Sequence, residues 1–356
     1  MKGRTRPKIG VAFSGGGVRG LAHLGVLQVL EEARIPVDLL AGTSMGGIVA
    51  GVYAAGVPLE KVIEFSTKVG LMDLAARDRR WLGLFGHAKM GKLLADLLGS
   101  EDITFEDLQI PTAVVAVDVE TGEMVILDRG PLIPALMATS AFPILFSPVH
   151  YVDKLTDHWL VDGGVVNNFP VDIVRRMGAD RVLGVTVPSV IAMPLQEEDE
   201  EPGDESYRRD ACGTHSTGGH GAPPRRGARL SPRALFAFSS RTMDWKMPFL
   251  IAEASVGFTA QIVSQMRLSH CPPDLVLEVS LPNVGLFATD KNAAVIEAGR
   301  REAMSHLAEL VALYARPLPP RWRRRLVGLA RRFRRAWAAF KEPAYLVFPG
   351  EHACRP

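Results

Sequence analysis

The sequence predicts an α/β fold whose mostly parallel central sheet is covered by helices on both faces. Short apolar runs alternate with segments of helical periodicity in the first half of the chain, which is the pattern of parallel βαβ units. Glycine-containing turns follow the first two apolar runs, where strands pass into helices. The 356 residues are 47% hydrophobic and 22% charged, enough to bury the core of one large domain or two small ones.

The expected elements of the first half follow in chain order. Residues 8–13 (KIGVAF) form an apolar strand that ends at a glycine turn, and residues 18–33 place leucines at helical spacing. A second strand over 38–42 precedes a helix of small residues over 45–55, and Pro58 opens another helix.

The rest of the chain supplies further strands and a closing helix. We expect strands over 112–118, 123–128, 181–187 and 275–279, and a helix over 290–314. Two uncharged runs, 39–59 and 131–152, are long enough to span a bilayer, but the first contains five glycines and a proline and the second four prolines. We interpret them as a buried strand–turn–helix and as irregular core, not as membrane spans.

The first glycine turn permits two interpretations. Gly15, Gly17 and Gly20 satisfy GxGxxG between a strand and a helix, which favours a nucleotide-binding oxidoreductase whose turn holds a pyrophosphate. That class needs an acidic residue at the end of the second strand, whereas Asp38 begins it and Ser44 follows it. The nucleotide interpretation stays open, but its partner residue is misplaced.

The second turn has the pattern of a nucleophile elbow. Gly42-Thr43-Ser44-Met45-Gly46 is a GxSxG motif between a short apolar strand and a small-residue helix, which exposes the serine hydroxyl on a sharp turn. If the first two strands are neighbours, Gly15-Gly16-Gly17 lies beside Ser44. Its backbone N–H groups then form an oxyanion hole for acyl transfer.

Arg19 is expected to brace the glycine turn or to add positive charge there. It lies in the first turn of the predicted helix, where a cation is disfavoured unless it has a specific role.

A serine nucleophile needs a base, and the better candidate is Asp162. None of the histidines after Ser44 follows a strand in a glycine-flanked context, and His23 lies within the first helix, where a structural role is favoured. Asp162 ends a short β run and is followed by Gly163 and Gly164, which permit close approach to its carboxylate.

These residues together resemble the patatin-like phospholipase family, in particular bacterial members akin to the catalytic domain of neuropathy target esterase. The matching blocks cover residues 9–180 in order: the glycine turn 15–20 and its continuation to 27, the GxSxG at 42–46, the run Ala138–Pro143, and Asp162-Gly163-Gly164 with the residues after it to 171. Residues 273–276 and 296–299 resemble the end of the family's domain.

The resemblance implies a three-layer α/β/α patatin-like fold and acyl-ester hydrolysis on lipids. Its serine–aspartate dyad would be Ser44 and Asp162, with no catalytic histidine, no metal and no cofactor. Gly15, Gly16, Gly17 and Arg19 would form the oxyanion hole, and Gly42, Gly46, Gly163 and Gly164 would support the two catalytic turns. The implied substrate is a phospholipid or lysophospholipid. A non-catalytic membrane-associated regulator on the same fold is a further alternative, although no motif residue is missing.

Two segments fall outside the α/β pattern. We expect a patatin-like domain over 8–315 that contains a disordered insertion at 194–232, because this acidic and then Gly/His/Pro/Arg-rich stretch has few aliphatic residues. Its Cys212, His215 and His220 are interpreted as loop residues, not metal ligands. Residues 316–356 form a basic amphipathic tail.

The tail predicts contact with an anionic membrane surface. Nine of the 41 basic residues lie between Arg321 and Lys341 with no acidic residue among them, which leaves 32 basic against 39 acidic residues in the rest of the chain. Trp322, Phe333, Trp337 and Phe340 fall on one helical stripe amid these arginines, a pattern typical of helices that lie on a bilayer.

With three cysteines, no CxxC pair and no visible targeting segment, we expect a cytoplasmic protein, peripheral at the inner membrane surface, that binds no nucleic acid.

Overall fold

The computed structural model describes residues 6–70, 73, 76–77, 85–152, 157–188, 247–282, 284–285 and 288–315. The described residues up to 188 and from 256 onward belong to one compact unit. The insertion at 194–232 and the tail at 316–356 lie outside the described residues, and with them the residues proposed for membrane contact.

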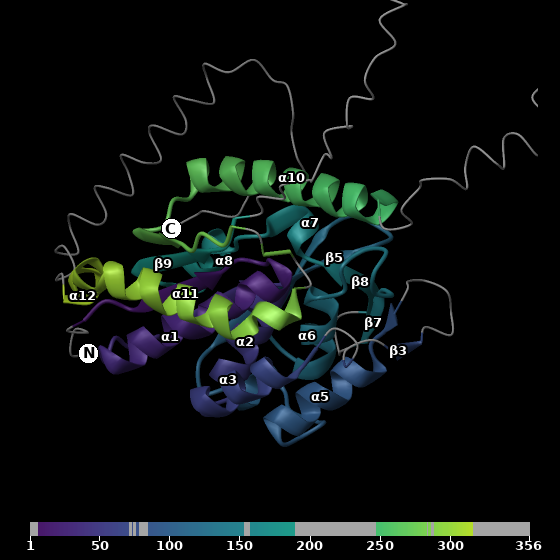
Figure 1. Ribbon diagram of the computed structural model, residues 1–356, viewed down its shortest axis with the longest axis horizontal. Helices are drawn as coiled ribbons and strands as arrows, with labels where there is room; N and C mark the ends of the chain where they lie inside the picture. Colours follow the sequence, from purple (N-terminus) through teal and green to yellow (C-terminus); the bar gives the residue numbers. More distant parts are fainter. Residues whose placement is uncertain are drawn as a thin grey trace, which may run out of the picture. The chain divides into compact units, whose positions relative to one another are not determined.

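The chain folds around one eight-stranded sheet (Figure 1). Its strands are β1 Ile9–Phe13, β2 Leu39–Thr43, β5 Thr112–Asp118, β6 Met124–Leu127, β7 Val149–Val152, β8 Asp157–Asp162, β9 Arg181–Thr186 and β10 Leu275–Glu278. The order is β10-β9-β1-β2-β5-β8-β7, with β6 also paired to β5. The five strands from β10 to β5 run parallel, and β6, β7 and β8 add antiparallel pairs at the other side.

Helices cover both faces of this sheet. The described helices are α1 Ala22–Glu32, α2 Met45–Ala54, α3 Leu59–Lys68, α5 Ala88–Leu98, α6 Leu132–Thr139, α7 Gly164–Asn167, α8 Val171–Arg176, α10 Met247–His270, α11 Asn292–Ser305 and α12 Leu307–Ala315. Short 3-10 turns span Gly17–Leu21, Phe105–Asp107 and Thr289–Lys291, and β3 Ala76–Arg77 pairs with β4 Phe85–Gly86 in a separate ribbon.

Alternation along the strands decides which helix packs where. Ala12, Ala41, Ala113 and Val115 belong to one buried cluster with the apolar side chains of α8. On the opposite face, Val114 approaches Gly47 of α2. Successive residues of a strand point to opposite faces, so α8 and α2 lie on different sides of the sheet. The predicted α/β/α fold class with a mostly parallel sheet is therefore confirmed.

Most predicted elements are present, with two differences. The helix expected over 290–314 is divided at His306 into α11 and α12. There the His306 N–H donates to the Ala303 carbonyl, three residues back, and the Ser305 hydroxyl donates to the Glu302 carbonyl at 2.8 Å. The run 131–152, expected as irregular core, contains α6 and β7. Pro134 fits α6 because it occupies the first turn, where the backbone N–H has no partner within the helix.

None of the described helices is long and apolar enough to cross a bilayer.

Candidate active site

The two glycine turns meet at the carboxyl edge of the sheet. Strands β1 and β2 are parallel neighbours, and their register places Phe13 opposite Gly42. The chain after β1 therefore lies beside the chain after β2. A Cβ on Gly46 would stand 2.6 Å from the Phe13 carbonyl oxygen, so α2 can pack against the first turn only without a side chain there. Gly42 is equally confined, since its Cβ would meet the Gly46 carbonyl oxygen at 2.3 Å.

Ser44 occupies a strained backbone conformation between β2 and α2. Its φ of 54° and ψ of −129° are disfavoured for a residue with a side chain. Strain of this kind costs about 1–3 kcal/mol and persists only where the surroundings enforce it. Here the Ser44 N–H donates to the Thr139 hydroxyl at 3.0 Å, and that hydroxyl in turn donates to the Val115 carbonyl. The elbow is thereby fixed to α6 and β5.

Asp162 contacts the serine directly. The Ser44 hydroxyl donates to Asp162 Oδ2 at 2.6 Å, across 118 residues of sequence. The aspartate is the last residue of β8, and its N–H donates to the Ala141 carbonyl at 3.0 Å. Its other oxygen, Oδ1, accepts the Gly164 N–H at 2.7 Å. A Cβ on Gly163 would stand 2.3 Å from the Val115 carbonyl oxygen, so that position leaves no room for a side chain.

Burial raises the pKa of the Asp162 carboxyl to about 6, although the hydrogen bonds from Ser44 and Gly164 oppose the shift. The residue is 2% exposed, and removal from water disfavours the charged form. A carboxylate with this pKa is a better proton acceptor than an ordinary aspartate, and it is still ionised at neutral pH.

The glycine turn offers backbone N–H groups beside Ser44. A Cβ on Gly15 would come within 3.0 Å of the Ser44 Cβ. The Gly15 N–H donates to the Asn168 carbonyl at 3.0 Å, so it is already used within the fold. The N–H groups of Gly16 and Gly17 donate no hydrogen bond to any described residue. This differs from the expectation that Gly15 is itself a donor to the oxyanion.

Arg19 is buried at 1% exposure. Its Nε donates to the Gly16 carbonyl oxygen at 3.3 Å, and its backbone N–H donates to the same oxygen at 3.2 Å. In a trans peptide the C=O and the next N–H point in opposite directions. Holding the Gly16 carbonyl toward Arg19 therefore directs the Gly17 N–H the other way. Of the two expected roles, the structure favours bracing of the turn.

Described histidines are engaged elsewhere. His23 is fully buried, its Nε2 lies 2.8 Å from the Ser14 carbonyl oxygen, and its ring stacks on Phe13. Burial lowers the pKa of His23 to about 4, against the opposing hydrogen bond to Ser14. His150 pairs with Asp157, and His158 with Asp118. Within the described ranges, no three His, Cys, Asp or Glu side chains form a metal-binding group.

The acid proposed for a nucleotide ribose has a structural role. Asp38 accepts two hydrogen bonds from Arg6, at 2.6 and 2.7 Å, and one from the Ile9 N–H at 2.8 Å. These contacts fix the start of β2 against β1, at the opposite end of the strands from the glycine turn.

Two further residues support the site, although no sequence motif indicates them. Thr139 holds the Ser44 N–H, and Asn168 accepts the Gly15 N–H while its side chain lies against Gly15 and Gly164. Both stand inside blocks of the family resemblance, but threonine and asparagine carry no local pattern that indicates these contacts.

Residues 11–175 match the family model described as patatin-like phospholipase. This part of the chain is therefore similar to a patatin-like phospholipase domain. The matched range includes the glycine turn, Ser44 and Asp162.

Relatives of the patatin-like domain include proteins of the neuropathy target esterase group. An uncharacterized NTE family protein of Mycobacterium tuberculosis is 32% identical over 203 residues, 55% of this chain and 54% of that protein. Neuropathy target esterase sws of Drosophila melanogaster is 30% identical over 191 residues, 52% of this chain and 13% of that protein. The chain thus matches about half of one relative's length and a small part of the other's. The crystal structure of VipD from Legionella pneumophila aligns with a TM-score of 0.49 and 11% identity, over 86% of this chain and 67% of that one.

Proposed function

We propose that this protein is a serine lipid acyl hydrolase of the phospholipase A, lysophospholipase or carboxylesterase type. The observation that carries the proposal is the 2.6 Å hydrogen bond from the Ser44 hydroxyl on its strained turn to the buried Asp162 carboxylate. Such a pair supplies a nucleophile and its base. The match to the patatin-like phospholipase family supports lipid esters as the substrates.

In the proposed first half-reaction, Ser44 Oγ attacks the ester carbonyl carbon while its proton passes to Asp162 Oδ2. The carbonyl oxygen becomes an oxyanion that accepts hydrogen bonds from the N–H groups of Gly16 and Gly17. These donors are placed before the charge develops, which is the main source of stabilisation in acyl transfer. The tetrahedral intermediate then releases the alcohol, which takes the proton from Asp162 and leaves an acyl-serine.

The second half-reaction repeats these roles with water. Asp162, again ionised, accepts a proton from the water that attacks the acyl-serine. When the second tetrahedral intermediate breaks down, the proton returns to Ser44 Oγ and the fatty acid leaves. The oxyanion contacts and the proton transfers all come from this chain's own groups.

The proposal extends to where the substrate is met. We place the enzyme at an anionic membrane surface, held there by residues 321–341, whose arginines and aromatic stripe suit a bilayer interface. This part rests on sequence pattern and on the lipid class of the proposed substrate.

Substitution of either member of the pair tests the proposal. Ser44→Ala and Asp162→Asn should each lower kcat on a short-chain p-nitrophenyl ester by about 10³-fold or more, and the double variant should be little worse than either. The reason is that removal of one member leaves the other with no role. The measurement is steady-state hydrolysis by purified protein whose fold is checked by circular dichroism.

His150→Ala and His158→Ala are matched controls that should retain most of the activity. A folded histidine variant as inactive as Ser44→Ala would replace the dyad with a triad. Wild-type protein that hydrolyses none of a panel of short-chain esters, lysophospholipids, phospholipids and triacylglycerols would favour the non-catalytic regulator.

A further inference from the structure

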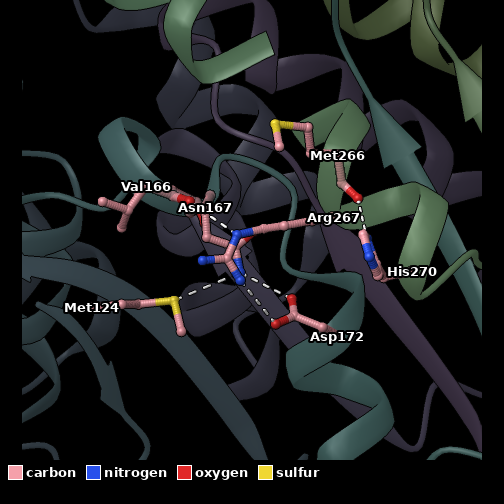
Figure 2. A network of polar contacts seen from close by, with 8 residues as sticks. Met124, Val166, Asn167, Asp172, Met266, Arg267 and His270 are labelled. Atoms are coloured by element: carbon pink, nitrogen blue, oxygen red, sulfur yellow. Dashed lines mark hydrogen bonds and ion pairs between the residues drawn. The ribbon is translucent and has the colours of Figure 1, made fainter. Parts of the chain in front are cut away.

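A network of polar contacts joins α7, α8 and α10 (Figure 2). The Asp162-Gly163-Gly164 turn leads into α7, a single helical turn whose last residue, Asn167, is fully buried. Its side-chain Nδ2 donates to Asp172 Oδ1 at 2.9 Å and approaches the Met124 sulfur at 3.7 Å. Asp172, in the first turn of α8, is 4% exposed.

The same network touches both catalytic turns through the backbone. The Thr43 hydroxyl, one residue before Ser44, donates to the Asn167 carbonyl at 2.8 Å. The next carbonyl along the chain, that of Asn168, accepts the Gly15 N–H. A displacement of α7 would therefore move the start of the elbow, the glycine turn and Asp162 together.

Arg267 closes the network from α10, about a hundred residues further along the chain. Its Nε donates to the Val166 carbonyl at 3.1 Å, and its Nη1 lies 3.5 Å from Asp172 Oδ2 (Figure 2). One guanidinium thus joins the end of α7 to the start of α8. Four residues are too few for a helix to be stable by itself, so α7 depends on such contacts for its position.

We propose that Arg267 is a positioning residue for the Ser44–Asp162 pair. It acts by holding α7 against α8, and it touches neither the substrate nor the reacting atoms. The planar guanidinium suits this task because its N–H groups donate to a carbonyl and to a carboxylate in one fixed arrangement, whereas the three donors of a lysine ammonium rotate at the end of a flexible chain. The inference rests on the proposed acyl hydrolase function for its effect on turnover, and on geometry alone for its effect on α7.

Three variants test this role. Arg267→Gln removes both the positive charge and the planar guanidinium, and Arg267→Lys keeps the charge but loses the planar set of N–H donors. Arg175→Gln is the matched control, because Arg175 on α8 makes an equivalent pair of contacts away from α7, with the Pro272 carbonyl at 3.0 Å and Asp274 at 2.8 Å.

Kinetics on a soluble short-chain p-nitrophenyl ester should separate the variants. Arg267→Gln should lower kcat about tenfold to a hundredfold, as a misplaced catalytic group does, with KM changed by less than about twofold. The kcat of Arg267→Lys should lie between those of Arg267→Gln and the wild type. Arg175→Gln should keep the wild-type kcat even if its Tm falls as much as that of Arg267→Gln.

Amide hydrogen exchange supplies a readout that needs no turnover. Peptides covering 162–168 should exchange faster in Arg267→Gln than in the wild type, and at the wild-type rate in Arg175→Gln. Unchanged exchange and kcat in folded Arg267→Gln, or equal losses in Arg175→Gln, would overturn the positioning role. Faster exchange in Arg267→Gln alone, in a protein whose wild type hydrolyses no ester, would overturn the acyl hydrolase proposal and leave the coupling of Arg267 to α7 intact.

Discussion

The Asp162 carboxyl is 2% exposed, and its removal from water raises its pKa to about 6. The charged form of Asp162 is the one that accepts a proton from Ser44 in the proposed mechanism. A pKa near 6 keeps that form dominant at neutral pH while making it more basic than a solvated aspartate.

Activity should therefore fall on the acid side of about pH 6. Protonation of Asp162 removes the base, so kcat/KM on a soluble ester should decrease about tenfold for each pH unit below that pKa. The measurement is a pH–rate profile of the free enzyme. The His23→Gln variant should show the same acid limb, because His23 is stacked on Phe13 and bonded to Ser14. An acid limb with an apparent pKa near 4 would mean that Asp162 is exposed to solvent in the working enzyme.

Gly16 is the residue at which the proposed oxyanion hole is most directly tested. A Cβ there would stand 2.5 Å from Val187 Cγ2, a buried side chain, so Gly16→Ala must shift the turn. The N–H donors act on the oxyanion and not on the bound ester, so kcat should fall more than KM rises. Loss of one such donor costs on the order of 2.7–4 kcal/mol in other hydrolases. Gly285→Ala, where a Cβ meets nothing within 4 Å, is the matched control. Full turnover by folded Gly16→Ala would place the oxyanion hole elsewhere.

At the scale of elements, the crossing of α1 and α11 depends on two glycines. A Cβ on Gly25 would lie 2.0 Å from the Ile296 carbonyl oxygen, and one on Gly299 would lie 1.9 Å from the Ala22 carbonyl oxygen. The two backbones are in contact there, which fixes α1 and the glycine turn that precedes it.

Gly299→Ala should force these helices apart. Overpacking of this kind costs about 1–3 kcal/mol of the free energy of unfolding, measurable as a lower Tm and a lower denaturant midpoint. Glu297→Ala, on the exposed side of α11, should leave both unchanged. If Gly299→Ala matched the wild type in stability, the close crossing would be absent in solution.

The differences between predicted and observed elements have local causes. The four prolines in 131–152 predict irregular backbone, yet only Pro134 lies within α6, and it occupies the first turn, where proline is tolerated. The break between α11 and α12 coincides with hydrogen bonds from the Ser305 hydroxyl and the His306 N–H to carbonyls three residues back, which apolar periodicity does not indicate.

At the scale of the whole molecule, truncation after Pro320 tests the proposed membrane surface. Each basic side chain near an anionic leaflet contributes about 1 kcal/mol to the free energy of membrane binding, and salt weakens this contribution. The truncated protein should bind anionic vesicles less well and hydrolyse vesicle lipid more slowly, with nearly unchanged activity on a soluble ester. Co-sedimentation with vesicles at low and high salt measures this. Equal binding by truncated and full-length protein would show that residues 321–341 are not the anchor.

Local patterns in the sequence were sufficient to predict the fold class, the order of the strand–turn–helix units and the candidate pair Ser44 and Asp162. These follow from local signals, because apolar periodicity and glycine spacing act over a few residues. The folded chain was needed to show three further features: Ser44 Oγ lies 2.6 Å from Asp162 Oδ2, the Gly15 N–H donates to the Asn168 carbonyl, and Thr139 and Arg267 contact the backbone at Ser44 and in α7. Those contacts join residues from about 95 to 153 positions apart. The sheet order brings the ends of β1, β2 and β8 together, and α6 and α10 add Thr139 and Arg267 from the covering helices. No short stretch of sequence carries that arrangement.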